Sequence, residues 1–106
     1  MEIVKDGYTL TNSYPPEERY GLISQTNRAT VSIPTNIAEG MGRSSFKDTI
    51  HFLHISRGSA YELETLLQIA LTLQIIDQNS FDRLNMKVEE AIKIINGLIK
   101  YLERKL

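Results

Sequence analysis

Apolar residues recur three and four positions apart along most of the chain, which is the spacing of one face of an α-helix. The pattern is clearest in the last quarter, in a seam formed by Phe81, Leu84, Val88, Ala91, Ile95, Leu98 and Leu102. A second line beside it comprises Ile92, Ile99 and Leu106. The combined stripe is wider than a two-stranded coiled coil requires, and no useful stretch alternates with period two. The pattern therefore predicts an all-α protein built as a helix bundle.

Prolines and glycines are few, three and six in 106 residues, and they mark helix ends. Pro15 and Pro16 suit the start of a helix, so they separate a short first helix, over about Glu2–Asn12, from a longer second one. The segment Gly40–Gly42 is typical of a helix C-terminus. We therefore predict that the second helix ends there.

Two further segments carry signals for the start of a helix. Ser45 is followed three residues later by Asp48, which resembles a capping box and predicts a third helix to about Gln74. The last turn covers residues 77–80, and we expect Asn79 or Ser80 to cap a fourth helix that runs almost to Leu106. Residues 1–106 are thus predicted to form a single domain with one short and three longer helices.

Composition and charge exclude several classes of function. The absence of cysteine rules out disulfides, zinc–thiolate sites and cysteine nucleophiles. Twelve basic against thirteen acidic residues mean that any nucleic-acid surface must be a local patch or be created by assembly. The first six residues include two acids, and the longest apolar stretch, 66–76, is interrupted by polar residues. We therefore expect neither secretion nor a membrane partner, and a cytoplasmic location.

A polar stripe on the second helix borders its apolar line, and two polar residues of the third helix share a stripe with Ile55 and Leu66. If those apolar residues point inward, the polar ones do too. The predicted structural network comprises Arg28, Ser32, Asn36, Glu39, Ser59 and Glu62. Arg28 and Glu62 are its natural charge pair, with Glu62 expected inside the bundle. We favour a network that fixes helix register over the alternative, a ligand or RNA pocket.

The sequence offers no catalytic or metal site. His51 and His54 are three apart, and Asp48 with His51 mimics half of a di-iron motif, but the fourth helix has no histidine to complete it. No serine has a sequence context that assigns it a histidine base. We therefore predict no catalytic residue, no metal and no cofactor, and we expect that the protein is not an enzyme.

Four basic residues are expected around the junction of the second and third helices, and they are the candidate nucleic-acid contacts: Arg28, Arg43, Lys47 and Arg57. Arg19 lies earlier in the chain, away from this junction. Arg43 and Lys47 straddle a turn where the first amides of the third helix also favour an anion. The alternatives are an ordinary solvated surface and the pairing of Arg43 with Glu39 or Asp48 across the turn.

Several strings together resemble one family: Glu18–Leu22, Arg28-Ala29, Val31–Pro34, Asn36–Gly40, Gly42-Arg43, Arg57–Ser59 and Glu62–Glu64. The chain resembles, over roughly residues 15–106, the four-helix-bundle proteins encoded in intervening sequences of bacterial 23S ribosomal RNA genes. Similar proteins are accessory factors of diversity-generating retroelements. The resemblance implies an antiparallel up-and-down four-helix bundle, a ring-like homopentamer without known enzymatic chemistry, and a suspected nucleic-acid role. In the retroelement branch it implies partnership with a reverse transcriptase.

Our leading hypothesis is a non-enzymatic oligomeric bundle that binds nucleic acid, RNA in preference to DNA, through the basic patch at the junction of the second and third helices. The alternative is a protein–protein scaffold or accessory subunit that binds no nucleic acid. The second apolar line of the fourth helix, with the small residue Gly58 on the third, predicts more apolar surface than one bundle covers. We therefore expect a homo-oligomer.

Overall fold

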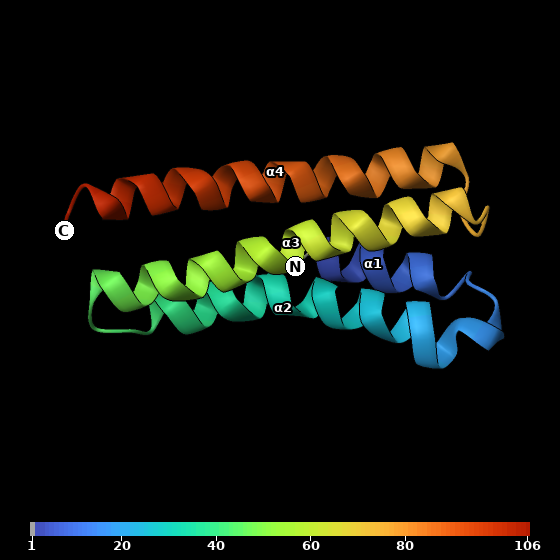
Figure 1. Ribbon diagram of the computed structural model, residues 1–106, viewed down its shortest axis with the longest axis horizontal. Coiled ribbons are helices and arrows are strands. Elements are labelled where there is room, and N and C mark those ends of the chain that lie inside the picture. The colour runs from blue at the N-terminus through green and yellow to red at the C-terminus, as the bar shows by residue number, and fades with distance from the viewer. Residues whose placement is uncertain (1) are drawn as a thin grey trace.

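The computed structural model describes residues 2–106, and for Arg19 only the course of the backbone. Four α-helices follow one another: α1 (Glu2–Thr11), α2 (Ser24–Met41), α3 (Phe46–Thr72) and α4 (Gln78–Glu103). A 3₁₀ turn (Pro16–Glu18) and a π-helical turn (Arg19–Ile23) lead into α2. Figure 1 shows α2, α3 and α4 running antiparallel along the long axis, with α1 beside only part of them. The predicted all-α four-helix bundle with a short first helix is confirmed.

The starts of α3 and α4 are set by capping side chains. Ser45 is extended, and its hydroxyl accepts a hydrogen bond of 3.1 Å from the amide of Asp48, as the sequence predicts. At α4 the prediction is wrong, because Asp77 is the cap: its carboxylate accepts a 2.8 Å hydrogen bond from the amide of Ser80. Buried Ile76 anchors the chain just before Asp77, so the first capping side chain after it begins the helix.

Neither α2 nor α3 ends in the usual glycine cap, in which a glycine adopts a positive φ. None of the glycines in residues 2–106 has a positive φ, whereas Gln74, just after α3, has φ 59°. Gly40 instead serves the contact between α2 and α3. A Cβ atom at Gly40 would lie 3.0 Å from the Cβ of Phe52 and 3.1 Å from the carbonyl oxygen of Thr49. A larger residue there would push the two helices apart.

The core lies between the helices along the predicted apolar faces. On α3 the buried line comprises Leu53, Ala60, Leu63, Leu67 and Ala70, and on α4 it comprises Leu84, Val88, Ile95 and Leu102. Ile92 and Ile99 are buried too, within the same chain, and only Leu106 of the second line is exposed. The inference that this line needs a second chain to cover it is therefore wrong. The stripe is wide because α4 packs against both α3 and α1.

Candidate nucleic-acid interface

The turn between α2 and α3 carries two of the four basic residues that we expected to bind nucleic acid. Arg43 follows the last turn of α2, Lys47 stands in the first turn of α3, and both side chains are exposed. The first amides of a helix lack intrahelical partners and form the positive end of its dipole. Ser45 already caps the amide of Asp48, whose carboxylate lies in the same turn. What suits an anion here is therefore the two cations together with the helix amides that precede Asp48.

Arg43 is positioned by two neighbours. Its Nη2 atom lies 3.8 Å from Oε1 of Glu39, and its guanidinium lies 4.7 Å from the centre of the Phe52 ring. The distance to Glu39 is too long for a hydrogen bond, and both side chains are about half exposed, so this pairing is weak. Among residues 2–106 no ion pair joins Arg43 to Asp48. The guanidinium therefore remains available to a ligand while Phe52 holds it near the turn.

The other two arginines lie away from this turn. Arg57 donates a 2.8 Å hydrogen bond to Oδ1 of Asn96 on α4 and a 2.7 Å hydrogen bond to Nδ1 of His54. Arg28 lies about 22 Å from Arg43 along α2, at the helical rise of about 1.5 Å per residue. The prediction that Arg28 lies at the junction of α2 and α3 is therefore wrong. The side chain of Arg19 lies outside the described residues.

The six residues of the expected polar network form three separate groups rather than one network. The hydroxyls of Ser32 and Ser59 share a 2.7 Å hydrogen bond between α2 and α3. Asn36 donates from Nδ2 to the carbonyl and hydroxyl oxygens of Ser32, each at 2.9 Å. Arg28 donates to Glu62 at 3.1 Å, while Glu39 faces Arg43. Ser32–Ser59 and Arg28–Glu62 join α2 to α3 and fit a role in helix register, whereas the contacts of Asn36 and Glu39 are local to α2 and its end.

The expectation that Glu62 lies inside the bundle is wrong. Its side chain is 40% exposed and that of Arg28 is 65% exposed. The expectation required both Ile55 and Leu66 to point inward, but only Leu66 is buried and Ile55 is exposed. The buried face of α3 is centred further round the helix, so the stripe that holds Glu62 lies at its edge. The ion pair consequently belongs to the surface.

Three interhelical contacts were missed by the sequence reasoning. Ser56 and Thr49 are buried hydroxyl residues of α3 that donate to backbone carbonyls of α2: Ser56 to Ile33 at 2.7 Å, and Thr49 to Gly40 at 2.8 Å. They lie seven residues apart on the buried line, and that spacing was the available signal. The third contact, of Lys87 on α4 with carboxylates of α1, carried no local signal because the residues are distant in sequence.

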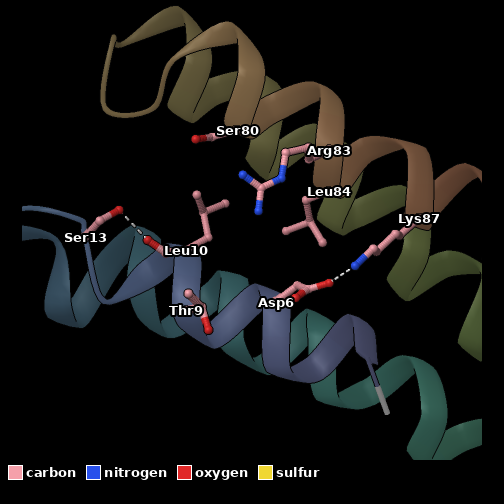
Figure 2. A pocket seen from close by; sticks show the side chains of 8 residues that line it. All are labelled: Asp6, Thr9, Leu10, Ser13, Ser80, Arg83, Leu84 and Lys87. Carbon is pink, nitrogen blue, oxygen red and sulfur yellow. Dashed lines mark hydrogen bonds and ion pairs between the residues drawn. The ribbon is translucent and has the colours of Figure 1, made fainter.

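A pocket of about 230 Å³ separates α1 from α4 and was not predicted. In Figure 2 the guanidinium of Arg83 points into it, between Leu10 and Ser80. Lys87 closes one side through hydrogen bonds to Asp6 and to Glu2, and these bonds raise the pKa of its ammonium group. The pairing ties α1 to α4 and leaves Arg83 as the pocket's other cationic side chain.

The described residues contain no group of three or more histidine, aspartate or glutamate side chains placed to hold a metal ion. His51 and His54 are exposed on α3. His51 contacts Phe52 edge to face at 5.5 Å between ring centres, and His54 accepts from Arg57. Both histidines thus have roles in surface packing.

Comparison with known proteins identifies the family of this chain. The family model described as 23S rRNA-intervening sequence protein matches residues 1–97. The chain belongs to this family. The match covers α1, α2, α3 and most of α4, and so it includes the α2–α3 turn, the interhelical contacts and the pocket.

A solved structure has the same fold as this chain. It is the crystal structure of a protein with unknown function from the S23 ribosomal protein family of Bacteroides thetaiotaomicron VPI-5482. The two chains are 24% identical and superpose with a TM-score of 0.81 over 92% of this chain and 88% of the other. This likeness establishes the fold alone. No curated protein matches the sequence. Within residues 2–106, no helix has the length and apolar character needed to cross a bilayer.

Proposed function

We propose that this member of the intervening-sequence family is a non-enzymatic protein that binds nucleic acid, RNA in preference to DNA, in the cytoplasm. The observation that carries the proposal is the α2–α3 turn, where exposed Arg43 and Lys47 flank the N-terminus of α3. One phosphate can accept hydrogen bonds from both side chains and from backbone amides. Such contacts recognise the nucleic-acid backbone rather than its sequence.

Assembly would strengthen a site that is weak in one chain. We propose a homo-oligomer, and the family resemblance favours a pentamer. Support comes from apolar side chains that the single chain leaves exposed, namely Ile55 and Ile69 on α3 and Met86 and Ile94 on α4. A ring would repeat the α2–α3 turn, and several weak phosphate contacts to one RNA would add as avidity. Light scattering that shows a monodisperse monomer at micromolar concentration would contradict this part of the proposal.

The decisive variant is Arg43→Glu/Lys47→Glu, with Lys5→Glu/Arg83→Glu as a control that changes the net charge equally at exposed positions elsewhere. Binding of labelled RNA and DNA is measured by fluorescence anisotropy over a range of salt concentrations. We expect the wild type and the control to bind with strong salt dependence, and the Arg43/Lys47 variant to lose binding while its melting temperature stays nearly unchanged.

Two results would overturn this assignment. Unaltered binding by the folded Arg43/Lys47 variant would remove the α2–α3 turn from the interface. A wild type without salt-sensitive affinity for RNA or DNA would favour the second candidate, a scaffold or accessory subunit for a protein such as a reverse transcriptase. The exposed Met86 and Ile94 on α4 are the observation that favours this alternative, because exposed apolar side chains on one helix suit a protein partner.

A further inference from the structure

The antiparallel order of the helices separates charges that the sequence intersperses. The Ser32–Ser59 and Arg57–Asn96 contacts lie near the middle of the bundle. Residues 33–58 and 94–106 form the half that holds the α2–α3 turn and the end of α4, at the left of Figure 1. This half carries six basic and three acidic residues, whereas residues 2–32 and 59–93 carry six basic and ten acidic ones. One end of the bundle therefore attracts phosphate and the other repels it.

The last turn of α4 and the two residues that follow it add three cations to the same end. The three are Lys100, Arg104 and Lys105, and all are exposed. Among the described residues, no carboxylate lies within 4.0 Å of the charged group of any of these three. The bundle measures 46 × 23 × 19 Å, so this turn and the α2–α3 turn occupy one narrow end. We call this surface the basic end and define it as Arg43, Lys47, Lys100, Arg104 and Lys105.

Aromatic rings are exposed beside these cations. Phe46, the first residue of α3, is 48% exposed next to Lys47, and Tyr101 of α4 is 53% exposed with the ammonium of Lys105 5.1 Å from its ring centre. A duplex hides the faces of its bases by stacking, whereas a single strand presents them. Rings interspersed with cations are the surface that single strands prefer, since bases stack on the rings while cations hold the phosphates.

We infer that the basic end binds single-stranded nucleic acid, with phosphates held at both the α2–α3 turn and the last turn of α4, and with bases stacked on Phe46 and Tyr101. The inference rests on the proposed function and adds to it the strandedness of the ligand and the contribution of α4. The competing explanation is local: cations at the C-terminus of a helix complement its dipole. That explanation predicts effects on stability alone.

The stacking part is tested with Phe46→Leu and Tyr101→Leu, which keep an apolar side chain but remove the ring. Affinities are measured for a labelled single-stranded RNA and for a duplex RNA of the same length, at one salt concentration. We expect the wild type to prefer the single strand. Each variant should weaken single-strand binding by about 5-fold to 150-fold, the effect of losing one stacked base, and leave duplex binding unchanged.

The α4 part is tested with Lys100→Glu/Arg104→Glu against the Lys5→Glu/Arg83→Glu control, with circular dichroism to verify that each variant is folded. The α4 variant should bind the single strand more weakly than the control does. The slope of log affinity against log salt should also fall by about 0.7 for each phosphate that α4 no longer neutralises.

The outcomes separate this inference from the function on which it rests. A wild type that binds no nucleic acid in a salt-sensitive way overturns both. A wild type that binds duplex at least as tightly as single strand, with Phe46→Leu and Tyr101→Leu unaltered, overturns the inference and leaves the proposed function standing. Equal binding by the α4 variant and its control removes α4 from the interface.

Discussion

Glu62 and Leu63 are neighbours on α3, yet the structure predicts very different costs for replacing them with alanine. Glu62 is 40% exposed and is paired with an Arg28 side chain that is 65% exposed. An exposed ion pair of this kind contributes about 0–1 kcal/mol to the free energy of unfolding. Leu63 is fully buried, and truncating a buried leucine costs about 2.7–5 kcal/mol, because the smaller side chain packs against fewer apolar atoms and leaves a cavity.

These free energies convert to melting temperatures. An unfolding entropy of about 2.1 cal/mol/K per residue gives about 0.22 kcal/mol/K for the 106 residues, so 1 kcal/mol shifts the melting temperature by about 4–5 °C. Glu62→Ala should therefore lower the melting temperature by less than about 5 °C. Leu63→Ala should lower it by about 12–22 °C.

Thermal and urea unfolding followed by far-UV circular dichroism measure both values, and light scattering verifies that the variants keep the association state of the wild type. Arg28→Ala and the Arg28→Ala/Glu62→Ala double variant complete a cycle whose coupling energy should stay below about 1 kcal/mol. A loss of about 12 °C or more for Glu62→Ala would refute the reasoning. It would mean that the ion pair is enclosed, either by a different rotation of α3 or by another chain.

Two further predictions concern glycine and tyrosine positions. Gly40→Ala should lower the melting temperature, because its Cβ would crowd the Cβ of Phe52 and the Thr49 carbonyl, whereas Gly58→Ala, with nothing within 4 Å, should stabilise the isolated chain by up to about 1 kcal/mol. Thermal melts that give both variants the same sign would contradict this. Burial raises the pKa of Tyr14 from 10.0 to about 12, so the folded state keeps its phenol protonated while the unfolded state ionises. Stability on the order of 3 kcal/mol, present below pH 10, should thus be lost as the pH rises to about 12. Tyr14→Phe should lack this loss. If thermal melts at a series of pH values showed the same alkaline loss of stability in the variant and the wild type, Tyr14 would not be its cause.

Local sequence determined the number, type and approximate bounds of the helices. The three- and four-residue spacing of apolar positions specifies a helical face, and capping by Ser45 acts over three residues of chain. Such signals need no knowledge of distant residues. The buried lines of α3 and α4 were readable for the same reason, since a stripe on a helix is a property of its own sequence.

Tertiary structure decided which polar residues face each other and where charge collects. The rotation of α3 about its axis decides that Leu63 is buried and Glu62 is half exposed. A periodic pattern leaves that rotation open because the apolar stripe has wide margins. The same holds for Ile92 and Ile99, which neighbouring helices of the same chain cover. The basic end also arises only on folding: α2 ends, α3 begins and α4 ends at one place because successive helices run antiparallel. Acidic and basic residues are interspersed along the chain, and only the folding back of each helix on the last gives one half of the bundle an excess of basic residues and the other an excess of acidic ones.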